Sequence, residues 1–289
     1  ANQYCRVLWC GPFYVASIDW RHFGCLSVNA VSTDFQDVTE MAGEPITSEQ
    51  LDRLCHRYAW ASRYCAGKDV VELACGTGPG IGVLNGVAGS FEAGDFSGPM
   101  IERVRQHYGG RVVVRQFDAQ AMPYPDQSKD VLIIFEALYY LPDVPAFIRE
   151  CRRVLRPGGK VLIATANKDL PDFNPSPYSH LYLGVAELGE QFAKEGFETS
   201  CFGYLSVSAV SAKQRLLRPV KQFVVASGLM PKTMRGKQLL KRLVFGKPVP
   251  MPAEIAESSA PVIEPAPLPA GVPDRSHKVI YCVATLRTA

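Results

Sequence analysis

Three closely spaced glycines are the residues of this chain best suited to hold a ligand. Gly76, Gly78 and Gly80 follow the apolar run VVEL within the stretch VVELACGTGPGIGVL, residues 70–84. Because glycine has no Cβ, such a turn lets the backbone approach a ligand closely. A helix is expected to begin directly after the turn, and its free N–H groups suit a carboxylate. The pattern predicts a binding loop for a ligand that carries a carboxylate.

Two common phosphate-binding patterns fail at this loop. The dinucleotide fingerprint G-x-G-x-x-G needs a glycine where this chain has Ile81, and the frame shifted by two residues fails at Val83. A P-loop needs Gly-Lys followed by Ser or Thr, and these residues do not follow. Hydride transfer with NAD is therefore disfavoured. A ligand with an amino-acid end and a nucleoside end, S-adenosylmethionine (SAM), fits the loop better.

The elements that must position this loop alternate along the chain. Strands are expected near 69–74, 90–95, 111–116, 129–135, 159–166, 198–207 and 277–286, and helices near 47–66, 79–88, 97–108, 143–155 and 180–195. Thr47 and Gln50 have the spacing of a capping box, which predicts where the first helix begins. Strands that alternate with helices predict a parallel sheet covered on both faces by helices.

Four motifs in order resemble the class I SAM-dependent methyltransferases of the methyltransferase type 11 kind. They are ELACGTGPG, GDFSGPMIERVR, FDAQAMPYPDQSKDVLIIFEALYYLPD and VLRPGGKVLIAT, and the resemblance covers about residues 47–207. It implies an α/β fold with a Rossmann-like, doubly wound, seven-stranded sheet whose last strand is antiparallel. It also implies SAM as the cofactor and methyl transfer as the activity.

The resemblance implies which residues contact the methionine part of SAM. Gly76, Gly78 and Gly80 would wrap around it, and Glu72 would lie near its ammonium group.

A second set of residues is implied for the adenosine part. Asp95 would accept hydrogen bonds from both ribose hydroxyls, a task that suits a carboxylate. Phe96 would cover one face of the adenine. Asp118 would take the adenine amino group, and Ala119 would contact the ring through its backbone.

Residues near the end of the fourth strand are expected to face the acceptor, because ligands of parallel α/β sheets sit outside the carboxyl ends of the strands. Phe135 and Glu136 would face the donor and the substrate cavity. An alcohol or phenol acceptor benefits from a general base, whereas a neutral amine does not require one. Candidate bases are His180, in the stretch NPSPYSHLY, and Glu136, followed by His56 in the first helix.

A long insertion over residues 208–276 separates the last two expected strands. It interrupts a domain that is expected to span residues 41–289. Residues 1–40 are expected to form an N-terminal extension. Between Thr199 and Ala253 there are ten basic residues and no acidic one. A helix is expected near 232–245, and the eight prolines of residues 248–273 predict an extended strap. The insertion is expected to fold over the catalytic face and to determine substrate specificity.

Composition narrows the class of protein and its partners. The apolar runs are shorter than the roughly 18 residues that a membrane span needs, so no transmembrane segment is expected. Nine scattered cysteines without CxxC pairs or Cys/His clusters are typical of reduced thiols in the cytoplasm, and no metal is expected. Methyltransferases that act on the amino groups of DNA bases resemble one another in a motif of the type [DNS]-PP-[YFW] after the fourth strand. This chain has FEALYY at that position, so no DNA partner is expected.

The expected function is methyl transfer to a small-molecule or glycan acceptor, most plausibly at oxygen. The basic insertion is compatible with an anionic acceptor. N- or C-methylation and a non-catalytic SAM-binding role remain alternatives, and the sequence does not indicate an oligomeric state.

Overall fold

The computed structural model describes residues 39, 41–176, 178–207, 248–256 and 263–288. The predicted extension over 1–40, apart from Thr39, and the predicted helix near 232–245 lie outside these residues. Two stretches of the predicted insertion lie inside them, so its contacts with the sheet can be described.

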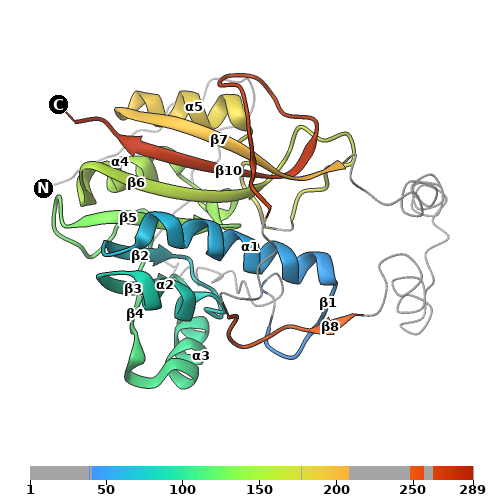
Figure 1. Cartoon of the computed structure of the whole chain (residues 1–289). Helices are drawn as coiled ribbons and strands as arrows, with labels where there is room; N and C mark the ends of the chain where they lie inside the picture. Colours follow the sequence, from blue (N-terminus) through green and yellow to red (C-terminus); the bar gives the residue numbers. More distant parts are fainter. Residues whose placement is uncertain (1–38, 40, 177, 208–247, 257–262, 289) are drawn as a thin grey trace, which may run out of the picture. The chain divides into compact units, whose positions relative to one another are not determined.

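One sheet organises the described chain, with the strand order β4-β3-β2-β5-β6-β10-β7-β9 (Figure 1). Its strands are β2 (Asp69–Leu73), β3 (Ser90–Asp95), β4 (Val113–Gln116), β5 (Lys129–Phe135), β6 (Leu155–Ala166), β7 (Phe197–Ser206), β9 (Ala266–Pro267) and β10 (His277–Leu286). Strands β2 to β6 pair in parallel. Strand β10 runs antiparallel between β6 and β7. The predicted sheet with an antiparallel last strand is confirmed, and the short β9 is added to it at one edge.

Strand β6 begins earlier than predicted, at Leu155 instead of near residue 159. Leu155 pairs with Lys129 at the start of β5, and the register then shifts before Val131 pairs with Lys160. Gly158 has φ +79°, which lets the chain form the irregularity inside a strand. Residues 155–158, which precede the predicted strand, are therefore part of the sheet.

Of the six predicted α-helices, five fall on described residues, and all five are found there. They are α1 (Ser48–Cys65), α2 (Ile81–Val87), α3 (Gly98–Tyr108), α4 (Val144–Val154) and α5 (Val185–Lys194), with the short 3-10 helices η3 (Gly109–Arg111) and η4 (Leu138–Tyr140). The capping box of Thr47 and Gln50 is confirmed at the start of α1. Helix α5 begins five residues later than predicted, at Val185, and the backbone N–H of His180 before it donates to the carbonyl of Tyr139 at 2.7 Å.

The helices cover the two faces of the sheet and bury a separate core on each. On one face α1, α2 and α3 pack against alternate residues of the strands, such as Val131 and Ile133 of β5. On the other face α4 and α5 pack against Leu132 and Ile134. This alternation follows from the pleat of a strand, and it confirms the doubly wound arrangement.

The described parts of the proline-rich segment are extended and bound to the domain. Residues 248–256, here called the return strap, include β8 (Val249–Pro250), which pairs antiparallel with β1 (Pro45–Ile46). Farther along, β9 pairs with β7. No helix among the described residues is long and apolar enough to cross a membrane.

His56 has a structural place that argues against a catalytic role. Its ring stacks on Tyr204 with centroids 3.7 Å apart. Its Nε2 lies 2.6 Å from the carbonyl oxygen of Ile263, and its Nδ1 lies 3.0 Å from the hydroxyl of Tyr281. Burial lowers the pKa of His56, which favours the neutral ring. With both nitrogens engaged inside the core, His56 secures the proline-rich segment against α1.

The capping box generates a stability prediction. The Thr47 hydroxyl accepts from the backbone N–H of Gln50 at 3.1 Å, so Thr47→Ala leaves a helix N–H without its partner. We expect the variant to lose about 1 kcal/mol of unfolding free energy, measured by urea denaturation. Gln50→Glu is the matched control, because a glutamate preserves the reciprocal bond. Equal stability of Thr47→Ala and the wild type would contradict the assignment.

Candidate functional site

The candidate site lies at the carboxyl edge of the parallel strands, where the loops after β2, β3 and β4 are joined by hydrogen bonds. The backbone N–H of Cys75 donates to the carbonyl of Gly94 at 3.0 Å, and that of Phe117 donates to the carbonyl of Asp95 at 3.1 Å. These bonds bring the predicted glycine loop and the predicted adenosine contacts to one edge, as the parallel topology requires.

Each glycine of the loop is required for its own reason. Gly76 has φ +56° and Gly78 has φ +71°, a region that favours glycine. Gly80 has an ordinary φ, but a Cβ there would overlap the ring of Tyr58. The hydroxyl of Tyr108, at the end of α3, donates to the carbonyl of Gly78 at 2.8 Å and supports the loop from below.

Two residues that are not glycine also adopt the left-handed region at this edge. Ala74 ends the β2 segment with φ +52°, and Glu136 follows β5 with φ +50°. Such conformations cost roughly 1 to 3 kcal/mol and persist only where surrounding contacts enforce them. Both residues directly follow adjacent central strands, β2 and β5.

Glu72 is a buried carboxylate with one unpaired oxygen. The residue is 2% exposed, and its Oε1 accepts from the hydroxyl of Tyr58 at 2.5 Å. Its Oε2 is buried and has no hydrogen-bond partner among the described residues. Burial raises the pKa of Glu72 from 4.5 to about 7, although the bond from Tyr58 opposes the shift. A cationic group placed at Oε2 would supply the missing partner and favour the anion.

Asp95 ties the glycine loop to the start of α3. Its Oδ2 accepts from the backbone N–H of Gly76 and its Oδ1 from that of Ser97, each at 2.8 Å. A carboxylate has about four lone-pair positions, so capacity remains for two further donors. Burial raises the pKa of Asp95, against the pull of the backbone donors. Phe96, beside it, is 57% exposed and offers an open aromatic face.

Asp118 and Ala119 lie in a tight turn after β4. The carboxylate of Asp118 accepts from the backbone N–H of Gln120 at 2.8 Å and from its side-chain amide at 3.1 Å. Ala119 is buried. Gln120 was not predicted as part of the site, yet it orients Asp118. A turn residue that bonds to the backbone two positions on is a local signal that could have indicated it.

Phe135 and Glu136 contact side chains of α1. The Phe135 ring packs edge-on to Tyr58 with centroids 5.4 Å apart. Glu136 accepts from the Arg53 guanidinium at 3.0 Å and from the hydroxyl of Tyr139 at 3.3 Å, one bond on each carboxylate oxygen. Glu136 thereby joins Arg53 and Tyr139, and its role as a general base stays a prediction.

His180 lies in the loop between β6 and α5 and is exposed. This loop is held against the end of β5 by aromatic contacts, because Tyr139 stacks on Tyr182 with centroids 4.2 Å apart. The hydroxyl of Tyr140 lies 2.5 Å from that of Ser176. The structure thus links the His180 loop to the segment that follows Glu136, and the role of His180 as a base stays a prediction.

Thiol or metal chemistry has no support in the described part of the chain. The cysteines that the structure describes are free and buried. Burial raises the pKa of Cys75, inside the glycine loop, well above its usual range, which makes a thiolate unfavourable there. Among the same residues, no group of three or more His, Cys, Asp or Glu side chains could hold a metal ion.

The residues present fit the cofactor that the loop predicts. The unpaired, buried Oε2 of Glu72 matches an ammonium group. Gly76 and Gly78 form the left-handed turn of the loop that a methionine part would contact, and Asp95 has lone-pair positions beyond the two that accept from Gly76 and Ser97. SAM carries all three of these groups.

Comparisons with known proteins give related sequences and folds. A family model described as a methyltransferase domain matches residues 71–163. A probable SAM-dependent methyltransferase of Mycolicibacterium smegmatis is 37% identical over 152 residues, which are 50% of this chain and 55% of that protein. The ubiquinone/menaquinone biosynthesis C-methyltransferase UbiE of Xanthomonas axonopodis is 31% identical over 60% of this chain and 76% of that protein. Its counterpart in Stenotrophomonas maltophilia is 30% identical over 65% of this chain and 80% of that protein.

Solved structures confirm the fold at low sequence identity. The YcgJ protein of Bacillus subtilis has a TM-score of 0.50 and 15% identity, covering 81% of this chain and 99% of its own. The [4+2]-cyclase SpnF has a TM-score of 0.53 and 17% identity, covering 87% and 86%. Because one of these proteins is named a cyclase, the fold alone does not determine the reaction. The chain spans about half the length of the mycobacterial relatives that it matches.

The buried Glu72 generates a pH prediction. In the folded protein the carboxyl keeps its proton up to about pH 7, whereas an unfolded chain releases it near 4.5. The folded state therefore binds more protons in this window, and stability falls as pH rises through it. Glu72→Gln removes this loss, so we expect its unfolding free energy without ligand to exceed that of the wild type by about 3 kcal/mol at pH 8.

The measurement is urea denaturation of both proteins between pH 4 and pH 8. At pH 4 the two unfolding free energies should nearly coincide, because Glu72 is then protonated in the folded and the unfolded states. A difference that stays constant over the whole range would show that Glu72 titrates normally.

Proposed function

This chain belongs to the class I SAM-dependent methyltransferases, and we propose on that premise that it binds SAM at the glycine loop and transfers its methyl group to a small-molecule or glycan acceptor. The observation that carries the proposal is the buried, unpaired Oε2 of Glu72 beneath this loop. A buried carboxylate oxygen without a donor is costly unless a ligand supplies the donor.

The cofactor contacts follow the arrangement of the loops. Glu72 would take the ammonium group, and the loop from Gly76 to Gly80 would surround the methionine part. Asp95 would hold the ribose hydroxyls while Phe96 covers the adenine. Asp118, oriented by Gln120, would accept from the adenine amino group, with Ala119 against the ring. When bound, SAM supplies an electrophilic methyl group on a sulfonium ion.

The task of the protein is then to hold the acceptor atom in line with that methyl group. Phe135 and Tyr139 provide apolar surfaces at the acceptor end, and the pair of Arg53 and Glu136 provides charge there. The imidazole of His180, which is exposed on the neighbouring loop, would accept the proton of a hydroxyl acceptor. Oxygen is therefore the proposed acceptor atom.

Carbon is the second candidate atom. Two relatives at 30–31% identity, of which this chain covers 76–80%, are named C-methyltransferases of ubiquinone and menaquinone biosynthesis. An activated ring carbon next to a phenolic hydroxyl would use the same base and the same apolar surfaces, so the site is compatible with both acceptor atoms.

Cofactor binding is tested through Asp95. We expect Asp95→Asn to weaken SAM binding roughly ten- to hundredfold, because a hydrogen bond to a charged group contributes about 1.5 to 3 kcal/mol. Isothermal titration with SAM and with S-adenosylhomocysteine measures the affinity. Asp126→Asn is the control, since Asp126 is exposed and pairs with Arg153. Unchanged affinity of Asp95→Asn would remove the ribose assignment.

The acceptor atom is tested by product analysis. Wild-type protein is incubated with SAM labelled with ¹³C in the methyl group and with a panel of phenols, quinols, hydroxy acids and sugar acids. Transfer to oxygen or to carbon gives distinct ¹³C chemical shifts of the new methyl group. We expect a methyl ether or ester, and a product methylated at carbon would favour the second candidate. SAM binding without transfer to any compound would support a binding protein instead.

A further inference from the structure

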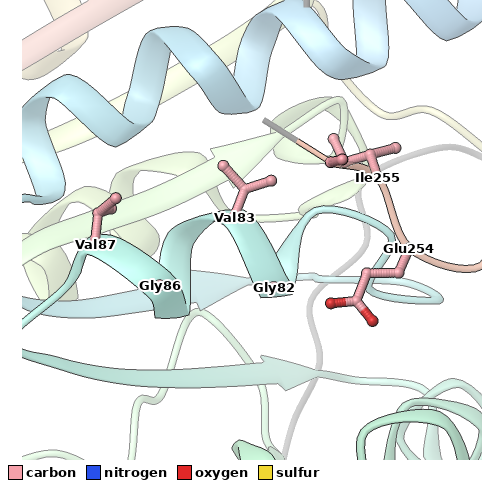
Figure 2. A pocket seen from close by; sticks show the side chains of 7 residues that line it. Gly82, Val83, Gly86, Val87, Glu254 and Ile255 are labelled. Atoms are coloured by element: carbon pink, nitrogen blue, oxygen red, sulfur yellow. The ribbon is translucent and has the colours of Figure 1, made fainter. Parts of the chain in front are cut away.

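The return strap contacts the glycine loop directly. The backbone N–H of Ile255 donates to the carbonyl of Pro79 at 2.8 Å, between Gly78 and Gly80. This bond joins two segments that are more than 170 residues apart in the sequence. A groove runs between α2 and the strap, with Gly82 and Gly86 on the helix side and Glu254 and Ile255 on the strap side (Figure 2).

A second connection leads from the strap to the loop through the end of α3. Glu254 accepts from His107 at 3.0 Å and from Arg111 at 3.0 and 3.4 Å. The Arg111 guanidinium lies over the ring of Tyr108, 4.7 Å from its centroid. The hydroxyl of Tyr108 donates to the carbonyl of Gly78 at 2.8 Å and lies 3.3 Å from the N–H of Gly82.

The strap fits closely against this part of the fold. A Cβ on Gly82 would overlap the Glu254 carboxylate, so the carboxylate fits in its present position because residue 82 has no side chain. Figure 2 shows the Glu254 side chain beside the Gly82 turn of α2. The pairing with Arg111 holds the pKa of Glu254 below its usual range, which keeps the carboxylate charged.

The strap is itself anchored firmly. Met251 and Ile255 are buried in the core that α1, α2 and α3 share. The backbone of Met251 exchanges hydrogen bonds with Gly43 and Glu44, each at 2.8 Å. Thr39 precedes Gly43 in the same N-terminal segment. A Cβ built on Gly76 would lie 3.3 Å from the methyl group of Thr39. The strap and the N-terminal segment are therefore bonded to each other, and each of them also lies close to the glycine loop.

We propose that Glu254 and Ile255 are positioning residues for the cofactor, which hold the glycine loop through Pro79 and Tyr108 in the form that binds SAM. The inference rests on the proposed function. It assigns to the return strap a role in cofactor affinity, in addition to the role in substrate specificity that was expected of the insertion. Glu254 pairs with His107 and Arg111 at the end of the helix that follows Asp95, and its neighbour Ile255 bonds to Pro79 in the loop after β2, so the two residues together join both halves of the proposed cofactor site.

The test compares two glutamates of the same proline-rich segment. Glu254→Ala removes the contacts with His107 and Arg111. Glu264→Ala is the matched control, because Glu264 also pairs with an arginine, Arg63 at 2.7 Å, but against α1 and away from the loop. The SAM dissociation constant is measured by isothermal titration of the full chain, and the urea midpoint without ligand is measured in parallel.

We expect Glu254→Ala to weaken SAM binding about three- to tenfold while Glu264→Ala stays within twofold of the wild type, and the urea midpoints of the two variants to agree. Arg111→Ala should also weaken binding, and the double variant should be no weaker than Glu254→Ala, because Glu254→Ala already removes the contact with Arg111. If Glu254→Ala does not fold, the SAM affinity of Arg111→Ala tests the inference in its place.

Three results would overturn the inference. Affinities of Glu254→Ala and Arg111→Ala equal to that of the wild type would show that the connection does not reach the cofactor. Equal weakening in Glu254→Ala and Glu264→Ala would indicate general loosening of the proline-rich segment. Failure of the folded wild type to bind SAM would reject the proposed function itself, and the wild-type titration separates that case from the other two.

Discussion

The hydrogen bond between Tyr58 and Glu72 joins α1 to the end of β2 directly beneath the glycine loop. The ring of Tyr58 occupies the space in which a side chain at position 80 would lie, and Phe135 packs edge-on against the same ring. One side chain of the first helix thus sets the position of the buried carboxylate, the close approach of the loop and the end of β5. The rest of the candidate site is built around this contact.

This arrangement costs stability in the absence of a ligand. A carboxyl group buried with one unpaired oxygen is less favourable than an apolar side chain of the same size, and two residues in the left-handed region add strain at the same edge. Local rules of stability are commonly broken at functional sites and compensated elsewhere. Here the compensation comes from two well-packed cores on the faces of the sheet.

The sequence predicted what depends on local pattern, and it missed what depends on distant contacts. Short β-branched apolar runs predicted the strands, and the spacing of Thr47 and Gln50 predicted where α1 begins. The support of Glu72 by Tyr58 and of Gly78 by Tyr108 was not predicted, because each joins side chains of separate elements. The contacts of Glu254 with α3 cross more than 140 residues and have no periodic signal.

The antiparallel course of β10 has a further consequence for the insertion. Val207 and Ser276, at its two ends, are joined by a backbone hydrogen bond of 2.7 Å, because β7 finishes and β10 starts at the same edge of the sheet. The sheet itself therefore closes the intervening loop. For a flexible loop, closure entropy grows only logarithmically with length, by about 0.6 kcal/mol per doubling. A chain of this topology can gain or lose dozens of residues between these strands at little thermodynamic cost, always beside the ligand edge.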